Sequence, residues 1–457
     1  MGLQALTRVF TALVRLGFFD LKSEVAYKRF PPQMIDSTPH RQLARHAASR
    51  VMVLLKNKGN ILPISQTRDE IQPGIAVASG NGGEQEKQQK KKVAIIGPNA
   101  DNIYALKGDY TGPTSAFNIT PRAAAIVEFG EERVAYAPGC ADTDCESDAG
   151  FDAAVGNATG AGLIVAVLGI QGDGPSANEI EGHDRQSVML PGKQEELLAR
   201  LAGLDAPLIV VLMNGGALSS PAADAHADAV IEAFYPGQFG GFGLFDIITG
   251  RVNPGARMPY TVPRDDSQIP PIADYSYRPS PENGGRGRTY KFINVTSQAP
   301  LYPFGFGMSF TTWRYSNIVI AGAGAGAGDD VGNPTISLCE DANVTVTVEN
   351  MGAVAGSEVI QLYLTNNDAV HPAPRWALAG FERVDVAAGT AVTVTIPVAA
   401  LARSEVGPPD YQPHLVGSNY TVWVGGGQPG QAPNRTTSNI EQGAFRTVGT
   451  GRALTAC

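Results

Sequence analysis

The sequence predicts an α/β domain built on a mostly parallel sheet, followed by an all-β sandwich. Short apolar runs recur along the first 265 residues, and stretches with helical spacing lie between them. Strands that alternate with helices indicate a mostly parallel sheet covered on both faces. From about Thr311 onward, alternating β-branched and aromatic runs replace this pattern, at the spacing typical of a β-sandwich.

The amino-terminal part predicts two helices. Apolar residues recur at helical spacing from Leu6 to Leu16, which predicts an amphipathic helix with one buried face. Thr38-Pro39 is a favourable helix start, because an N-cap residue precedes a proline at the first helical position. This second helix is expected to include Leu54 and to stop near Gly59.

Four short apolar runs predict the strands of the α/β domain. Each run is bounded by turn residues, which is typical of a buried strand. The polar stretch 65–92 predicts a surface loop, and the glycines of 236–243 favour a helix packed closely against the sheet. The expected strands are 93–96, 163–168, 208–213 and 229–234, with a helix over 192–201.

The second domain is predicted from four further runs in which β-branched and aromatic residues alternate with polar ones. Turn residues separate them, and a Gly-Ala repeat over 321–328 predicts a flexible loop. The expected strands are 344–348, 359–364, 391–396 and 420–424.

Charge and hydropathy exclude several classes of function. The 457 residues carry a net charge of −9, which argues against nucleic acid or an anionic membrane as the main partner. No uninterrupted apolar segment reaches the roughly 18 residues needed to span a bilayer. Small polar partners such as sugars remain.

Cysteine spacing and glycosylation signals favour an extracellular or secretory-pathway location. Cys140 and Cys145 have no second Cys/His pair nearby to complete a zinc site, so a local disulfide is favoured over metal binding, and free thiols are the alternative. Asn-x-Ser/Thr signals occur at Asn118, Asn157, Asn294, Asn343, Asn419 and Asn434.

The most informative stretch is Asn178–Arg185, which follows the apolar run 163–169 after a short polar connection. In open α/β sheets, ligands bind on the loops at the carboxyl ends of such strands. Glu179 and Glu181 lie two residues apart, with Asp184 close behind. A carboxyl crowded by like charges has a raised pKa and can act as an acid near neutral pH. Such a loop could protonate a leaving oxygen, although acidic loop residues are more often simply solvated.

Segments along nearly the whole chain resemble the carboxyl-terminal portion of glycoside hydrolase family 3 enzymes, in particular the β-xylosidase-like branch. They occur in the order found in that family. The matching segments are 15–20, 53–57, 96–100, 137–140, 181–185 with 190–192, 235–238, 253–261, 287–292, 302–305 and 376–384.

The resemblance implies a domain organisation. It implies a terminal helix and linker left from a missing (β/α)8 barrel domain at 1–34, and an α/β sandwich domain at 35–265. A linker wrapping between the domains at 266–310 and a fibronectin type III-like β-sandwich at 311–457 would follow. Phe306 departs from the family pattern, which often has histidine there, and we expect an effect on packing only.

The resemblance also implies a site. Glu181, in the Glu-Gly-x-Asp-Arg context, matches the general acid/base of a retaining β-glycosidase, and Glu179 is the alternative. Glu179, Asp184 and Arg185 are assigned to substrate binding, and Asp184 and Arg185 are expected to brace the loop through an ion pair. No metal or organic cofactor is implied, and the substrate would be a β-linked xyloside or glucoside.

Retaining hydrolysis needs two carboxyl groups, and the family's nucleophilic aspartate belongs to the barrel. The sequence therefore predicts a family 3 exo-β-glycosidase, most like a β-xylosidase, in which this chain supplies only the acid/base half. Three hypotheses follow. In the first, the chain is part of a larger protein that is an active exo-glycosidase. In the second, it is a stand-alone protein that binds carbohydrate or a barrel-bearing partner without catalysis. In the third, it is a structural or adhesive glycoprotein.

Overall fold

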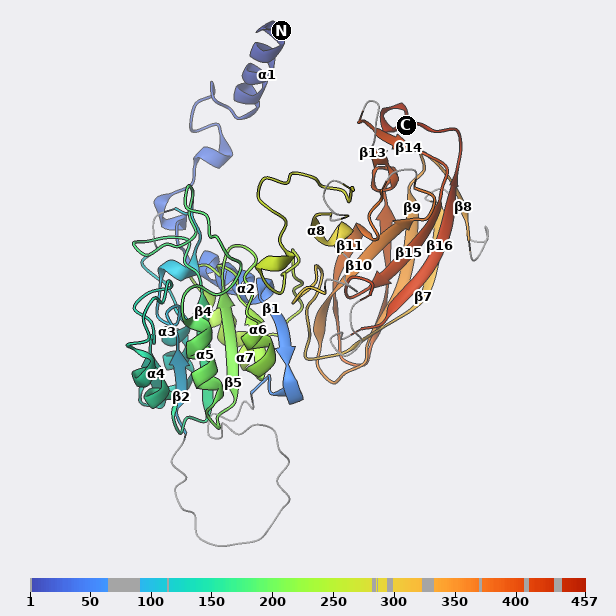
Figure 1. Ribbon diagram of the computed structural model, residues 1–457. Helices are drawn as coiled ribbons and strands as arrows, with labels where there is room; N and C mark the ends of the chain where they lie inside the picture. Colours follow the sequence, from blue (N-terminus) through green and yellow to red (C-terminus); the bar gives the residue numbers. More distant parts are fainter. Residues whose placement is uncertain are drawn as a thin grey trace.

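The computed structural model has an α/β part and a β-sandwich that lie side by side, with the first helix projecting away from both (Figure 1). The structure describes residues 2–64, 91–112, 115–281, 285, 287–293, 299–322, 333–369, 372–406, 411–430 and 438–457. Most of the expected loop at 65–92 and most of the Gly-Ala repeat lie outside these residues.

A six-stranded sheet organises the α/β part, in the order β1-β6-β5-β4-β2-β3. All neighbouring strands pair in parallel except β1, which runs antiparallel to β6 at one edge. The mostly parallel sheet is therefore confirmed. The strands are β1 (Val53–Asn57), β2 (Val93–Ile96), β3 (Val134–Ala137), β4 (Leu163–Gly169), β5 (Leu208–Met213) and β6 (Ala229–Glu232).

Helices cover both faces of this sheet. One core cluster packs α4 (Phe151–Ala158), α5 (Gln194–Ala202) and α6 (Pro221–His226) against one face. A second cluster packs α3 (Pro121–Phe129) and α7 (Gly240–Ile248) against the other. The strands β4 and β5 are buried along their whole length, as expected for a sheet covered on both sides.

The helix expected from Thr38 to near Gly59 is shorter than predicted. α2 spans Thr38–Val51 with Ser37 as its N-cap, and the chain then enters strand β1. The apolar run 51–55 fits either a buried helix or a buried strand, and periodicity does not separate the two. Pairing with β6 decides for the strand, which makes the prediction for Leu54 wrong.

The glycines of 236–243 allow close packing, but against different partners from those expected. A Cβ on Gly243 would lie 2.7 Å from the Ala48 Cβ, so it lets α7 approach α2. A Cβ on Gly241 would lie 2.2 Å from the Thr120 carbonyl oxygen. Gly243 and Gly241 thus face a helix and a loop rather than the sheet.

The expected buried face of the first helix is not buried. α1 spans Gly2–Arg15, and none of its described residues is buried. Leu6 is 53% exposed and Val9 is 55% exposed. The helical spacing is confirmed and the burial is wrong, because α1 projects away from the rest of the described chain (Figure 1).

The second domain is a β-sandwich, as predicted. One sheet has the order β11-β10-β15-β16-β8 and the other β12-β9-β7, with a small sheet β13-β14-β17 at one end. Their inner faces form one core cluster. The strands are β7 (Trp313–Gly322), β8 (Thr335–Ser337), β9 (Ala342–Asn350), β10 (Gly356–Asn366), β11 (Ala377–Val386), β12 (Ala391–Val398), β13 (Glu405–Val406), β14 (Pro413–Leu415), β15 (Asn419–Gly425), β16 (Ile440–Val448) and β17 (Arg452–Ala453).

A buried ionic cluster joins the two domains. The Arg257 guanidinium lies 2.5 Å from the Glu358 carboxylate, and both side chains are almost fully buried. The Tyr315 hydroxyl donates to the same carboxylate at 2.7 Å, and Arg257 also donates to the Gly307 carbonyl oxygen at 2.6 Å. A disulfide between Cys339 and Cys457 ties the end of the chain to the sandwich.

Candidate active site

The candidate site lies at the carboxyl ends of β2 and β4, where the strand order reverses. β2 pairs with β3 on one side and with β4 on the other, and the sheet then continues through β5. In open α/β sheets, ligands bind at such a switch point, outside the carboxyl ends of the strands. The loop after β4 carries the residues predicted from sequence.

Glu181 lies at the tip of a tight hairpin turn within that loop. Ile180 and His183 exchange two backbone hydrogen bonds, at 3.3 and 3.0 Å. Gly182 has a φ of 77°, a left-handed conformation that glycine adopts without steric cost. The Glu181 side chain is exposed, so the hairpin presents this carboxyl outward from the sheet.

Glu179, the second candidate acid, is held by an arginine. Its Oε2 lies 2.5 Å from Arg185 Nε, and Arg185 also donates to the carbonyl oxygens of Ser187 and Ala217 at 3.1 Å each. The expected ion pair between Asp184 and Arg185 is therefore wrong, because Arg185 pairs with Glu179.

An open cavity of about 760 Å³ lies beside the hairpin. Asp184 and Arg185 both line it, as does Gly182, the neighbour of Glu181. The remaining lining residues are Asp144, Asn178, His183, Gln186, Ser187, Met189, Leu190, Pro191 and Gly192. Of the residues predicted from sequence, Asp184 and Arg185 line this cavity, whereas Glu179 and Glu181 lie beside it in the chain and do not line it.

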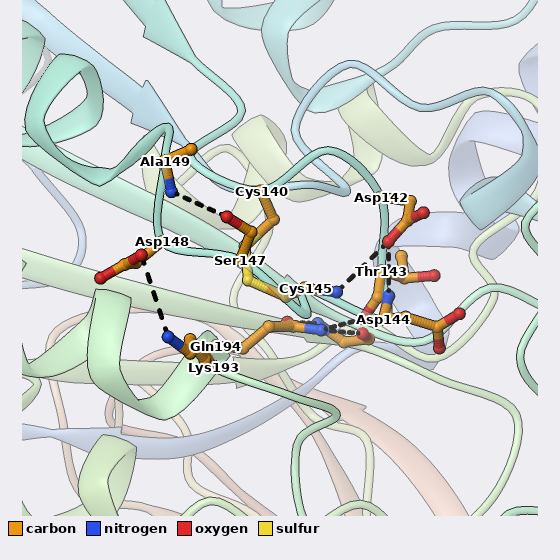
Figure 2. Close-up of a disulfide and its surroundings, with 11 residues drawn as sticks. Cys140, Asp142, Thr143, Asp144, Cys145, Ser147, Asp148, Ala149, Lys193 and Gln194 are labelled. Carbon is orange, nitrogen blue, oxygen red and sulfur yellow. Dashed lines mark hydrogen bonds and ion pairs between the residues drawn. A yellow bond between two sulfur atoms is a disulfide. The ribbon is translucent and has the colours of Figure 1, made fainter.

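The disulfide predicted between Cys140 and Cys145 is confirmed, and it closes a small loop on the floor of this region (Figure 2). Gln194 is fully buried beneath it. The Gln194 side-chain amide donates to the Thr143 carbonyl oxygen at 2.7 Å and to the Gly169 carbonyl oxygen at 2.8 Å. The disulfide loop is therefore fixed to the end of strand β4.

Asn178 fixes the base of the hairpin to the disulfide loop. Its side-chain amide donates to Asp144 Oδ1 at 3.1 Å, and its Oδ1 accepts the backbone N–H of Gln171 at 2.9 Å. Asn178 is 6% exposed, so these bonds form away from water. The base of the hairpin is rigid, whereas its tip is open.

A buried carboxyl network lies behind the site and was not predicted from sequence. Glu232, at the end of β6, is 1% exposed and accepts a hydrogen bond from the Asn214 side-chain amide. Tyr260 donates its hydroxyl to Asn214 Oδ1 at 3.1 Å and also contacts the Gly216 carbonyl oxygen at 3.3 Å. Burial raises the pKa of Glu232 to about 8.

The loop after β2 also reaches the hairpin, and sequence reasoning missed it. The backbone N–H of Glu181 donates to Asp109 Oδ2 at 2.9 Å. The pKa of Tyr110 is raised, first because its hydroxyl hydrogen-bonds to Glu181, then by partial desolvation and by the nearby charge of Asp109. The carboxyl ends of parallel neighbouring strands lie at the same edge of a sheet. The polar segment that follows strand 93–96 could therefore have indicated that Asp109 and Tyr110 lie near the hairpin.

The described part of the chain contains neither an evident metal centre nor a membrane-spanning helix. There, no group of three or more His, Cys, Asp or Glu side chains is arranged to hold a metal ion. Among the same residues, no helix is both long and apolar enough to cross a membrane.

Comparison with known families identifies both parts of the chain. The profile of the glycosyl hydrolase family 3 C-terminal domain matches residues 52–310. The profile of the fibronectin type III-like domain matches residues 358–428.

Curated relatives and solved structures agree with this. A beta-xylosidase from Formosa agariphila is 30% identical over 402 residues, which cover 86% of this chain and 49% of the relative. A probable exo-1,4-beta-xylosidase from Aspergillus terreus is 33% identical, over 83% of this chain and 45% of the relative. The chain spans about half the length of the curated relatives it matches.

The structure of a family 3 exo-beta-xylosidase bound to a xylobiose aziridine activity-based probe superposes with a TM-score of 0.76 at 26% identity. It covers 98% of this chain and 53% of that one. A β-glucosidase from Erythrobacter marinus superposes with a TM-score of 0.72 at 26% identity, over 94% of this chain and 53% of that one. The chain therefore belongs to glycosyl hydrolase family 3, with the family's C-terminal α/β domain followed by its fibronectin type III-like domain.

Proposed function

We propose that this chain supplies the general acid/base of a retaining exo-β-glycosidase, most like a β-xylosidase, and that Glu181 is that residue. The observation that carries the proposal is the contrast within the hairpin. Glu181 is exposed at its tip beside the cavity, whereas Glu179 is occupied by Arg185. An acid/base must reach the glycosidic oxygen, so the carboxyl at the tip is the better candidate.

In the proposed reaction, protonated Glu181 gives its proton to the glycosidic oxygen while an aspartate carboxylate attacks the anomeric carbon. The bond to the leaving group breaks, and a glycosyl-enzyme ester forms. Glu181, now ionised, then takes a proton from water as that water attacks the anomeric carbon and releases the aspartate. No metal or organic cofactor takes part in either step.

The aspartate is proposed to come from a (β/α)8 barrel domain outside these 457 residues. The support is the family resemblance and the fact that the chain spans about half the length of its curated relatives. The barrel would belong to a longer polypeptide or to a partner chain. Asp184 and Arg185, which line the cavity, are proposed to contact or orient the sugar beyond the cleaved bond.

A secreted, glycosylated state is part of the proposal. Asn157 and Asn419 are exposed, and each begins an Asn-x-Thr signal. The two disulfides fit an oxidising compartment. Treatment of the secreted protein with an N-glycosidase should lower its apparent mass, and an unchanged mass would contradict this part.

The test uses a fusion of the amino-terminal half of the Formosa agariphila relative to this chain, beside the chain alone. We expect no turnover of 4-nitrophenyl β-xyloside by the chain alone and clear turnover by the fusion. In the fusion, the substitution Glu181→Gln should lower kcat/KM by about 10²–10⁴-fold on substrates with poor leaving groups. The loss should be small on 2,4-dinitrophenyl β-xyloside, whose departure needs no acid.

Two further variants separate the acid/base from a structural residue. In Glu181→Ala, added azide should restore turnover and give a β-xylosyl azide, because the small anion attacks the glycosyl-enzyme without a base. Glu179→Gln should lower activity without azide rescue. Azide rescue at position 179 and not at 181 would reverse the assignment. Robust hydrolysis by the chain alone would refute the missing-nucleophile proposal, and sugar binding without turnover by the fusion would favour a non-catalytic binding protein.

A further inference from the structure

Tyr110 combines two features that are unusual in one residue. Its φ is 59°, in the left-handed region that aromatic residues rarely adopt. Tyr110 as a whole residue is 78% exposed, so no apolar core compensates for that conformation. Backbone strain of this kind persists only where the surrounding structure imposes it, and it gathers at functional sites. The hydroxyl of Tyr110 contacts the Glu181 side chain.

Asp109 connects the same two residues through their backbones. Its Oδ1 accepts the N–H of Tyr110 at 2.9 Å, and its Oδ2 accepts the N–H of Glu181 at 2.9 Å. One carboxylate therefore bridges two loops that are 72 residues apart in sequence. This bridge holds the backbones of Tyr110 and Glu181 close together, so the Tyr110 hydroxyl can reach the Glu181 side chain.

The segment that carries Asp109 and Tyr110 is itself anchored to the loop after β4. Lys107 Nζ lies 2.7 Å from Asp173 Oδ2, which ties the two loops together just before Asp109. Gly174 lies directly against the Tyr104 ring, since a Cβ there would come within 2.5 Å of it. The two loops thus share a packed base, and Asp109 and Tyr110 extend from it to the hairpin tip.

We propose that Asp109 and Tyr110 are the positioning residues of Glu181, with Asp109 fixing its backbone and Tyr110 orienting its side chain. The inference rests on the proposed role of Glu181. A phenol hydroxyl can donate to an ionised carboxylate and can accept from a protonated one, so it can hold Glu181 in both halves of the reaction. The exposed hairpin tip offers no other described contact that would fix this side chain.

The first experiment needs no catalysis and uses the 457-residue chain labelled with [ζ-¹³C]tyrosine. The Tyr110 resonance is identified by its loss in Tyr110→Phe. We expect Tyr110 to titrate above the ordinary tyrosine pKa of about 10 and to move back toward it in Glu181→Gln. Glu179→Gln is the matched control and should leave the Tyr110 titration unchanged. Equal titration of Tyr110 in wild type and in Glu181→Gln would overturn the proposal.

The second experiment uses the fusion enzyme and Tyr110→Phe, which keeps the ring and removes only the hydroxyl. Loss of a hydrogen bond to a charged group should lower kcat/KM roughly tenfold. It should also move the alkaline limb of the pH–rate profile to higher pH, because the ionised carboxylate loses a donor. A purely structural tyrosine would leave the pH profile in place, and that outcome would overturn the proposal.

The two proposals fail in different ways. If Glu181→Gln shows no leaving-group dependence and Glu181→Ala no azide rescue, the role of Glu181 is wrong whatever Tyr110 does. If Glu181 passes those tests while Tyr110→Phe changes neither the titration nor the pH profile, only the positioning role is wrong. The double variant Asp109→Ala/Tyr110→Phe should lose less activity than the sum of the losses in the two single variants. Such non-additivity is expected because both residues act on Glu181.

Discussion

Two buried glutamates, one behind the candidate site and one at the domain junction, are held in opposite ways. Glu232 is bound by the neutral side-chain amide of Asn214, and its pKa is raised to about 8 by burial. Glu358 is also buried, but it faces the Arg257 guanidinium at 2.5 Å. Burial raises the pKa of Glu358 as well, while Arg257 opposes that shift.

The difference shows how the site region and the domain junction each accommodate a carboxyl group that is buried away from water. Near the site, the group can remain protonated and act as a neutral hydrogen-bonding partner. At the junction, the opposite charge comes from another domain, so the Glu358 carboxyl faces a positive charge only when the two domains are joined. The junction cluster therefore makes the contact between domains specific, whereas the Glu232 network serves one domain internally.

The largest expected effect is at the junction. Arg257→Met leaves the Glu358 carboxylate buried without its opposite charge, and breaking such a pair costs about 3–5 kcal/mol of the free energy of unfolding. Urea unfolding followed by circular dichroism measures it. The double variant Arg257→Met/Glu358→Gln should recover much of the loss, because no uncompensated charge remains. A single variant as stable as wild type would show that the pair does not hold the domains together.

The pH dependence of stability is the next largest effect, and it belongs to Glu232. Its folded pKa of about 8 lies above the unfolded value near 4.3, so the folded state binds more protons between these values. The free energy of unfolding should therefore fall as pH rises, by up to about 1.4 kcal/mol per pH unit. Between pH 6 and pH 7.5 the fall should reach about 2 kcal/mol at most, and it should end once Glu232 is ionised above its folded pKa.

Glu232→Gln is the control for that slope. The amide cannot ionise, so this variant should show a flatter stability profile over the same pH range. Denaturant unfolding at several pH values compares the two proteins. An unchanged slope in Glu232→Gln would assign the pH dependence to other groups.

Two tyrosines give a matched comparison of similar size. Tyr315 donates to the Glu358 carboxylate at 2.7 Å, and Tyr260 donates to the neutral Asn214 amide oxygen at 3.1 Å. Tyr315→Phe should cost about 1.5–3 kcal/mol and Tyr260→Phe about 0.5–1.5 kcal/mol, because hydrogen bonds to charged groups are stronger. Thermal unfolding of both variants checks the order. The reverse order would show that the Glu358 cluster is held chiefly by Arg257.

The smallest effect is expected on α1. Leu6→Gln replaces an exposed apolar side chain on a helix with no buried residue, so the free energy of unfolding should change by less than about 0.5 kcal/mol. The measurement is again urea unfolding of the 457-residue chain. A loss above about 1.5 kcal/mol would show that the apolar face of α1 is covered in solution.

Patterns within single segments were enough for much of the fold. The runs 163–168 and 208–213 became buried central strands, and the alternating run at 344–348 became part of β9. The close spacing of Cys140 and Cys145 correctly indicated a local disulfide. Where one pattern fitted two structures, as at 51–55, pairing with β6 decided the outcome.

The candidate site divides in the same way. Its loop, with Glu179, Glu181, Asp184 and Arg185, was found from residue types following a buried strand. The pairing of Arg185 with Glu179 was not, because it depends on which side of a hairpin each side chain points to. Asp109 and Tyr110 reach Glu181 from 72 residues away, which no local pattern encodes.

By itself, then, the sequence determined the two fold classes, the main strands and the acidic loop, because hydrophobic periodicity and turn residues act over a few neighbouring positions. Only the tertiary structure decided which carboxyl of the loop pairs with an arginine and which is exposed, which glutamate is buried behind the site, and which segments reach Glu181. These depend on distances between segments remote in sequence, and such distances are set by how the sheet brings strand ends together.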